Sequence, residues 1–250
     1  MNIILLESSE ILEHRAVIED ERAKHIAKVL RSSPGDSIRV GVVNGLTGTG
    51  IIGKINRRPP YSVELHISLT DPPPLPSNVD IVLALPRPIM FKRILSQATT
   101  LGVKNFHIIN ASRVEKSFWD AHVIDEDKYR KHLLKGLVQA VDTRLPTVHF
   151  HKGFKTFIDS EIYKLKHDYR YLVVADPRFS KMSHDTLAGG AGRVLLAIGP
   201  EGGWIDYEID RMVRSGFVGF GNGSRILRVD TAVIALHTML ASSNRSEIKL

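Results

Sequence analysis

Two glycine-rich segments in the C-terminal part of the chain carry the residues best suited to chemistry. The first, Gly199-Pro200-Glu201-Gly202-Gly203-Trp204, follows the apolar residues 194–198 and precedes Asp206, which we expect to be a helix N-cap. Glycines let a ligand approach the backbone closely, and Pro200 fixes one torsion. Such a segment can wrap a planar or flexible ligand. Its spacing fits equally well with a sharp strand-to-helix turn that binds nothing.

The second segment, residues 219–228, leads to Asp230-Thr231-Ala232 at a predicted helix start. The guanidiniums of Arg225 and Arg228 stay charged, so they could hold a phosphate or stabilise a developing oxyanion. The alternative is a salt bridge with Asp230 or Glu201. Because we expect the two segments to follow neighbouring strands, we predict that they form one joint pocket.

Other patterns in the sequence give weaker signals. Residues 48–53 fit G-x-G-x-x-G, but Asn56-Arg57-Arg58-Pro59-Pro60 follows where a dinucleotide-binding loop needs a helix. His149 and His151 share one face of a predicted strand with no third ligand nearby, so we expect no metal site. The chain has no cysteine, which excludes disulfides, thiolate metal sites and a cysteine nucleophile.

The proline-rich residues 71–77 divide the chain into two parts, whose helices and strands must position the two glycine-rich segments. Before them, residues 20–31 read as a helix with one apolar face and one basic face, the apolar face being formed by Ala23, Ile26, Ala27 and Leu30. Residues 38–43, 50–55 and 61–69 read as strands separated by glycine and asparagine. This part of the chain is therefore expected to be a small β-rich barrel.

After the proline-rich residues, strands and helices alternate. We expect strands at 79–85, 106–110, 148–150, 171–175 and 194–198, and helices at 91–101, 128–141, 207–215 and 231–240. This alternation predicts an α/β domain with a mainly parallel sheet covered on both faces. Ligands of such sheets bind beyond the carboxyl ends of the strands, which is where both glycine-rich segments fall.

The composition is that of an ordinary globular protein of 250 residues, with 43% hydrophobic and 24% charged residues. A net charge of +7 makes an extended polyanion such as a nucleic acid a plausible partner. No apolar run approaches the roughly 18 residues that span a bilayer, and the first residues lack the features of a signal peptide. We therefore expect no membrane partner and a cytoplasmic location.

Long stretches of the sequence resemble the RsmE family, the uridine-N3 methyltransferases of small-subunit (16S) ribosomal RNA. The resemblance rests mainly on LLAIGPEGGW followed at the right interval by NGSRILRVDTA. It extends to residues 25–31 with Pro34-Gly35-Asp36, to LALPR and LGVKNFHIINASRVEKS, and to Gln139 with Arg144-Leu145-Pro146. Nearly the whole chain is covered.

The resemblance implies a PUA-like β-barrel that helps to hold RNA, expected over residues 1–72. It implies a SPOUT α/β-knot methyltransferase domain with a deep trefoil knot over residues 73–250, in a homodimer whose active sites lie near the subunit interface. S-adenosylmethionine is the implied cofactor. Its expected binding residues are Leu196, Gly199, Glu201, Gly202, Gly203, Asn222, Gly223, Ile226 and Leu227.

Four residues differ from the family pattern, namely Gln97, Thr100, Asn222 and Asp230. They leave two alternatives open. One is a SPOUT methyltransferase that modifies another RNA nucleotide. The other is a noncatalytic RNA-binding or ribosome-assembly protein that keeps the fold.

Methylation of uridine N3 requires that a proton leave before the nitrogen can attack, so a base or stabilisation of the uridinate is needed. We expect Arg228, with Arg225, to stabilise the charge, and Asp230 or Glu201 to accept the proton. Basic side chains should gather the RNA electrostatically, although a solvated helix face is the alternative for those of residues 20–31. The expected RNA-binding residues are Arg22, Lys24, Lys28, Arg31, Arg57, Arg58, Arg113 and Arg144.

Overall fold

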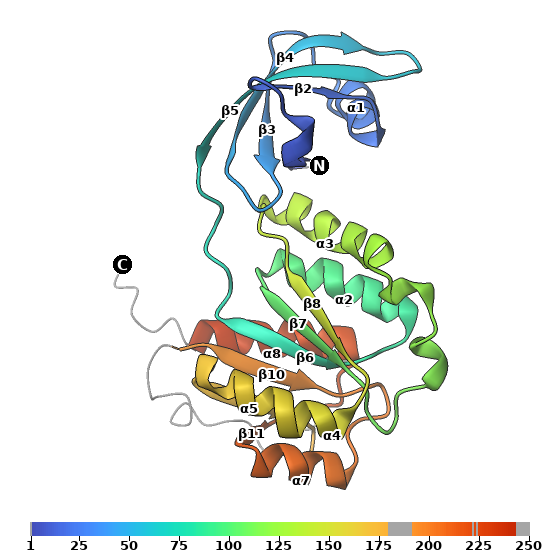
Figure 1. The fold of residues 1–250 in the computed structure, drawn as a ribbon, viewed down its shortest axis with the longest axis vertical. Helices are drawn as coiled ribbons and strands as arrows, with labels where there is room; N and C mark the ends of the chain where they lie inside the picture. Colours follow the sequence, from blue (N-terminus) through green and yellow to red (C-terminus); the bar gives the residue numbers. More distant parts are fainter. Residues whose placement is uncertain (1, 180–191, 222, 224, 244–250) are drawn as a thin grey trace. The chain divides into compact units, whose positions relative to one another are not determined.

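The computed structural model describes residues 2–179, 192–221, 223 and 225–243. This part of the chain divides into two compact units, which are described separately (Figure 1). The N-terminal unit comprises Met1–Leu75 and Leu134–Leu145, and the C-terminal unit comprises Pro76–Leu133 and Pro146–Leu250. Within the described residues, no helix is long and apolar enough to cross a membrane.

The N-terminal unit is built on a mixed five-stranded sheet in the order β1-β3-β4-β5-β2. Its strands are β1 (Ile4–Leu6), β2 (Arg15–Ile18), β3 (Ser37–Val42), β4 (Thr47–Asn56) and β5 (Ser62–Asp71). β1 pairs with β3 in parallel, whereas the other pairs are antiparallel. The three central strands were predicted from the sequence. β1 and β2 were not, because runs of three and four residues are too short for a clear period.

The predicted helix at residues 20–31 is present but changes its geometry midway. Asp20 caps α1 (Glu21–His25), which continues as the π-helical turn η2 (Ile26–Leu30) and ends at Arg31 in the left-handed region, with φ 55°. Ala23, Ile26 and Ala27 are buried as expected, but Leu30 is 42% exposed. A π turn takes more residues than an α turn, so it rotates Leu30 away from the core. The expected inward position of Leu30 is therefore wrong.

Residues 134–145 pack within the N-terminal unit, although they lie far along the chain. Leu137 joins Ile3 and Leu5 in a small buried cluster. The main-chain N–H of Asn44 donates to the carbonyl of Thr143 at 2.7 Å, and the Thr143 hydroxyl donates to the carbonyl of Gly45. The C-terminal part of α3 (Glu126–Ala140) thus contributes to the core of this unit.

The C-terminal unit contains a parallel sheet of six strands in its described part, in the order β11-β9-β10-β6-β7-β8. They are β6 (Val79–Ala84), β7 (Asn105–Ile109), β8 (Thr147–His151), β9 (Tyr171–Ala175), β10 (Val194–Ile198) and β11 (Phe217–Phe220). Every residue of β6 and of β10 is buried, so both faces of the sheet centre are covered. The predicted parallel sheet is confirmed.

Helices cover both faces of this sheet, with α5 in front of it and α8 behind it in Figure 1. Between the strands lie α2 (Pro88–Thr100), the short turns η3 (Lys116–Phe118) and η4 (His122–Ile124), and α7 (Asp206–Arg214), whereas α8 (Val229–Ser243) follows the last strand. The sequence analysis missed the helical stretch made of α4 (Phe154–Thr156), η5 (Phe157–Glu161), α5 (Ile162–Leu165) and η6 (Lys166–Asp168). α8 packs on β6 and β10 and against α2, which sets its N-terminus beside the carboxyl ends of the central strands.

Candidate active site

A cavity of about 1150 Å³ opens at the carboxyl edge of the parallel sheet. The chain that follows five strands lines it, namely β6, β7, β9, β10 and β11, together with the first turns of α8. Its wall combines apolar side chains with charged groups, which is the usual make-up of a small-molecule site. The lining residues used below are Arg87, Arg113, Asp176, Arg178, Gly199, Glu201, Gly202, Gly203, Trp204, Asp206, Arg225, Ile226, Leu227 and Arg228.

The segment after β10 forms a tight turn along this cavity. The N–H of Gly203, which has φ +73°, donates to the carbonyl of Pro200 at 2.8 Å. The buried indole of Trp204 packs over Gly199, where a Cβ atom would lie 3.1 Å from the ring. The Glu201 carboxylate accepts a hydrogen bond from the main-chain N–H of Arg87 at 3.2 Å. This turn therefore presents backbone and one carboxylate to the cavity, as the sequence predicted.

Leu196, expected at the cofactor, lies in the middle of β10, is fully buried and does not line the cavity. Asp206, expected to be an N-cap, is instead the first residue of α7, and Ile205 occupies the cap position. The carboxylate of Glu208 satisfies the helix start, because it accepts from the N–H groups of Ile205 and of Ser112. The prediction for Asp206 is wrong because a residue three positions later supplies the carboxylate.

The segment after β11 brings Arg225, Ile226, Leu227 and Arg228 to the same cavity. Ile226 is 84% exposed, which is unusual for so large an apolar side chain. Gly223 has φ +77° and does not line the cavity, and Asn222 lies outside the described residues. The joint pocket predicted from the two glycine-rich segments is thus present in the structure.

The glycines at the start of this second segment serve the packing of the chain. A Cβ atom on Gly219 would lie 2.3 Å from the ring of Phe179, and one on Gly221 would lie 1.9 Å from the carbonyl oxygen of Phe179. Both distances are far below van der Waals contact. These glycines are required because the segment after β9 passes directly against the segment after β11.

The two glycine-rich segments do not follow neighbouring strands, because β9 lies between β10 and β11. The residues after β9 therefore reach the cavity too, and sequence reasoning missed them. Arg178 donates to the Asp176 carboxylate at 2.8 Å and to the carbonyl of Trp204 at 3.4 Å, and it also pairs with Asp206. The Asp-Pro pair directly after an apolar strand is the local signal that could have revealed this segment.

Asp176 is held in its charged form inside the cavity wall. Burial alone would raise the pKa of this carboxyl group, but the hydrogen bonds from Arg178 outweigh burial and keep the pKa below its usual value. Arg178 thus links the segments after β9 and β10 by neutralising a buried charge. This link fixes the part of the cavity wall that the segments after β9 and β10 form.

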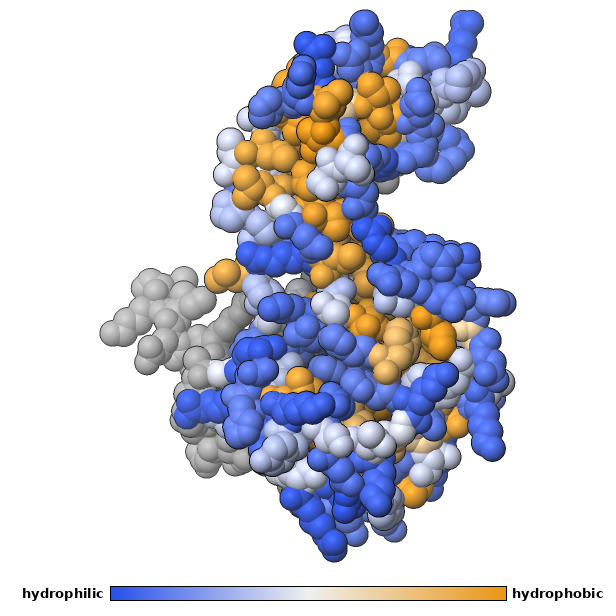
Figure 2. Space-filling model, viewed as in Figure 1, coloured by the Kyte–Doolittle hydropathy of each residue, from blue (hydrophilic) through white to orange (hydrophobic). Residues whose placement is uncertain are grey.

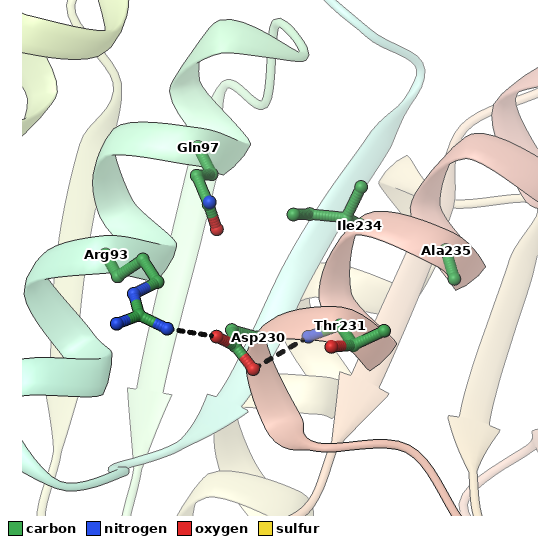
Figure 3. A pocket seen from close by; sticks show the side chains of 6 residues that line it. All are labelled: Arg93, Gln97, Asp230, Thr231, Ile234 and Ala235. Atoms are coloured by element: carbon green, nitrogen blue, oxygen red, sulfur yellow. Dashed lines mark hydrogen bonds and ion pairs between the residues drawn. The ribbon is translucent and has the colours of Figure 1, made fainter.

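Asp230, expected beside the chemistry, lines a second and smaller cavity of about 360 Å³ between α2 and α8. Figure 3 shows its carboxylate paired with Arg93 and bonded to the main-chain N–H of Thr231, at 2.9 Å and 3.0 Å. Arg228 Nε lies 4.0 Å from the same carboxylate. Burial would raise the pKa of Asp230, but these hydrogen bonds and the charge of Arg228 lower it. Such a carboxylate is a poor proton acceptor.

The expected RNA-binding residues fall in different places. Arg113 belongs to the C-terminal unit, lines the large cavity and donates to the carbonyl of Gly202. Arg22 has a structural role, because its guanidinium binds Glu10, Asp20 and the carbonyl of Leu5. The remaining six belong to the N-terminal unit, namely Lys24, Lys28, Arg31, Arg57, Arg58 and Arg144.

Lys28 lies over the ring of Tyr61 at 5.9 Å from its centroid. Beside it on η2, Val29 is 65% exposed, so this helix face mixes basic and apolar side chains where we had expected a purely basic one. Figure 2 shows apolar side chains grouped on the visible face of the N-terminal unit, whereas the visible face of the C-terminal unit is largely hydrophilic. A mixed surface of this kind can meet both phosphates and bases of RNA.

Histidines gather on β7 and β8. His107 stacks on His149 with ring centroids 5.1 Å apart, and its Nδ1 lies 3.2 Å from Nε2 of His151. Within the part of the chain that the structure describes, no group of three or more histidine, cysteine or acidic residues could hold a metal ion. The rings of His107 and His151 contact Phe157 in a tilted arrangement, and of the three histidines only His107 is buried.

Comparisons with known proteins agree with this geometry. Residues 73–241 match the model of the RNA methyltransferase domain, and residues 18–65 match that of the RNA methyltransferase PUA domain. A Treponema pallidum protein named ribosomal RNA small subunit methyltransferase E is 29% identical over 237 residues, which cover 94% of this chain and 88% of that protein. A Borreliella burgdorferi protein named ribosomal RNA small subunit methyltransferase E 1 is 22% identical, with 97% and 98% covered.

Solved structures share the fold. A ribosomal RNA small subunit methyltransferase E from Neisseria gonorrhoeae, bound to S-adenosyl methionine, matches with a TM-score of 0.71 and 20% identity over 97% of each chain. A Legionella pneumophila protein in complex with the bound cofactor SAM matches with a TM-score of 0.76, again at 20% identity over 97% of each chain. The resemblance to the RsmE family is confirmed. The domain match spans more than half of the chain, which therefore belongs to the RNA methyltransferase family.

Proposed function

We propose that the protein transfers a methyl group from S-adenosylmethionine to N3 of a uridine in 16S ribosomal RNA. The observation that carries this proposal is the joint cavity, where the glycine turn after β10 meets three acidic residues and the two arginines that precede α8, Arg225 and Arg228. The names of the relatives support the small-subunit substrate, and the two solved structures support the methyl donor. The substrate is either the free RNA or the small ribosomal subunit, which agrees with a cytoplasmic location.

The residues of the cavity fit the proposed cofactor. The turn at Gly199, Gly202 and Gly203 brings main chain without side chains to the cavity wall, which would let an adenosyl group approach closely, and Ile226 and Leu227 would add apolar contacts. When bound, S-adenosylmethionine supplies an electrophilic methyl group on a positively charged sulfur. Glu201 places a negative charge in the same wall. Asn222 and Gly223 remain binding residues by resemblance, and Leu196 supports the turn from within β10.

Arg228 and Arg225 supply the positive charge that the reaction needs. Loss of the N3 proton leaves a uridinate, and a guanidinium facing the cavity stabilises that charge as it develops. Both arginines line the cavity, and the Arg228 side chain is 72% exposed and so accessible to a nucleotide. Glu201 is the proton acceptor that the geometry favours, because Asp230 faces the smaller cavity and is paired with Arg93. We assign Asp230 the role of holding Arg228.

We further propose that the backbone of the C-terminal unit is knotted in the SPOUT manner. The insertion of β10 between β6 and β9, two strands that precede it in the chain, supports this proposal. Threaded backbones are rare among folds, so the proposal rests mainly on the resemblance to SPOUT methyltransferases. We also propose a homodimer in which each active site lies near the subunit interface.

The deciding experiment combines calorimetric titration with S-adenosylmethionine and a methylation assay on small-subunit RNA, followed by mass mapping of the modified nucleotide. We expect donor binding and a single N3-methyluridine in 16S ribosomal RNA. RNA binding without donor binding would instead indicate a noncatalytic assembly protein. A methyl group on another nucleotide would show a different specificity within the same family.

A further inference from the structure

Arg93 on α2 and Asp230 at the start of α8 lie 137 positions apart in the chain and form an ion pair. Arg93 Nη1 lies 2.9 Å from Asp230 Oδ2, and Figure 3 shows both side chains directed at each other across the smaller cavity. The Asp230 side chain is only 11% exposed, whereas that of Arg93 is 48% exposed. The buried member of the pair is therefore the carboxylate, and Arg93 reaches it from the surface.

The two oxygens of this carboxylate have different partners. Oδ2 is taken by Arg93, while Oδ1 accepts from the N–H of Thr231 and lies 4.0 Å from Nε of Arg228. Arg228 lines the large cavity, and Arg93 and Asp230 line the small one. Asp230 thus stands between the two cavities, with one oxygen facing each arginine.

Arg93 determines which way the carboxylate faces. A carboxylate can rotate about its terminal torsion, which has no sharp minimum. With Oδ2 fixed by a guanidinium, Oδ1 is left toward Thr231 and Arg228. Without Arg93, the carboxylate has no charged partner on α2 among these contacts. Only the N–H of Thr231 and the side chain of Arg228 then orient it, so the carboxylate and the Arg228 guanidinium are held less firmly.

We infer that Arg93 is a positioning residue for methyl transfer, acting through Asp230 to hold the guanidinium of Arg228 at the large cavity. This inference rests on the proposed function. The Arg93–Asp230 ion pair, rather than the smaller cavity as a whole, is then part of the support of the active site. Because the Asp230 carboxylate is mostly buried, loss of Arg93 should also lower the melting temperature, so thermal unfolding is measured beside turnover for each variant.

The test compares Arg93→Ala and Arg93→Lys with the control Gln97→Ala, which changes another residue lining the same cavity one helical turn away. We expect Arg93→Ala to lower kcat by about 10- to 100-fold, as a small misplacement of a reacting group does. The affinity for S-adenosylmethionine should stay within about twofold. Arg93→Lys should recover most of the lost kcat, and Gln97→Ala should keep kcat within about twofold.

A double variant tests whether Arg93 acts through Asp230. In an Asp230→Asn background the target of Arg93 has lost its charge, so adding Arg93→Ala should change kcat by less than about twofold. Multiplied losses would overturn the inference. So would unchanged kcat in Arg93→Ala, a loss of the same size in Gln97→Ala, or a fall in the melting temperature that accounts for the lost activity.

The wild-type protein separates this inference from the proposed function. Absence of methyl transfer to 16S ribosomal RNA by the wild type would remove both. Turnover by the wild type, together with a low rate for Arg228→Ala and a normal rate for Arg93→Ala, would keep the proposed function and remove the role of Arg93 alone.

Discussion

Arg113 and Gly202, 89 positions apart in the chain, are joined by a hydrogen bond from the guanidinium Nη1 to the Gly202 carbonyl oxygen. A Cβ atom on Gly202 would lie 3.0 Å from Cδ of this same arginine. The segment after β7 and the segment after β10 are therefore in contact at the cavity wall. Any side chain added at Gly202 must either displace Arg113 or extend into the cavity.

Gly202→Val should lower the affinity for S-adenosylmethionine by at least about tenfold while the protein stays folded. The reason is steric. The Cβ atom of the valine would lie 3.0 Å from Cδ of Arg113, which is closer than ordinary van der Waals contact, and a methyl group of the side chain would extend into the space proposed for the donor. Calorimetric titration measures the affinity, and circular dichroism checks the fold.

The control is Gly35→Ala in the N-terminal unit. Gly35 has φ +90° and open space around it, so this change strains the backbone without touching the cavity. It should leave the donor affinity unchanged. Equal affinities of the wild type and Gly202→Val for S-adenosylmethionine would show that the glycine turn does not bind the cofactor.

Arg228→Ala should reduce kcat by about 10² or more while donor affinity changes by only a few fold. Removal of one preorganised charge stabiliser has effects of this size. Single-turnover methylation of RNA measures the chemical step. Arg214→Ala, an exposed arginine of α7 that does not line the cavity, is the matched control and should keep normal turnover. Near-normal rates for Arg228→Ala would exclude it from the mechanism.

The sequence predicted the local features of this site well. The apolar run of β10 was placed at its observed bounds, because five apolar residues in a row stand out between Arg193 and Gly199. The glycine turn after β10 and the two arginines before α8 were also predicted, because in each case the informative residues lie close together in the sequence. Both signals are local, and neither depends on knowing the order of strands in the sheet.

What could not be predicted depends on contacts between distant segments. Asp176 and Arg178 reach the cavity only because β9 lies between β10 and β11, and strand order is a long-range property. Gly221 can carry no side chain because the main chain of Phe179 lies directly against it. Phe179 is 42 positions earlier in the chain, and no sequence pattern indicates this contact. The pairing of Asp230 with Arg93, which lowers the pKa of a carboxyl group expected to act as a base, also joins segments that are far apart in the sequence.

Lys28→Ala should reduce the slope of log affinity against log salt for RNA binding by about one, because one phosphate contact is lost. Lys28 lies over Tyr61 on the surface of the N-terminal unit and is accessible to RNA. Binding measured at several salt concentrations gives the slope. Identical slopes for the variant and the wild type would count against this helix face.

Arg22→Ala is the contrasting variant on the same helix. Its guanidinium is bound by Glu10, Asp20 and the Leu5 carbonyl, so its loss leaves partly buried acceptors without partners. We expect a stability loss on the order of 1–3 kcal/mol in urea unfolding, with the salt slope of RNA binding unchanged. A changed salt slope of RNA binding, together with normal stability, would show that Arg22 contacts the RNA.

A homodimer should be the form of the protein at micromolar concentration. Ile226 is 84% exposed on the rim of the cavity, and an active site near a subunit interface would cover it. Light scattering measures the mass, and Ile226→Asp should weaken the dimer because it places a charge at that position. A monomeric mass for the wild type would contradict the proposed assembly.

The stability of the C-terminal unit should fall as the pH falls from about 6.5 to about 4. Burial, together with the nearby imidazoles of His149 and His151, lowers the pKa of His107 to about 4. In the unfolded chain this group titrates near its ordinary pKa of about 6.5. Between these values the unfolded state binds more protons than the folded state, so the free energy of unfolding increases with pH. The full difference is about 3 kcal/mol.

Urea unfolding at several pH values tests this expectation with His107→Gln, which removes the titrating group. Its pH dependence between about 4 and 6.5 should be shallower than that of the wild type, because His151, whose pKa burial also lowers, would be left as the main contributor of this cluster. His122→Gln is the matched control, because the His122 side chain is 92% exposed and lies outside the cluster. Parallel curves for His107→Gln and the wild type would show that His107 is protonated equally in both states and makes no contribution to the acid sensitivity of the fold.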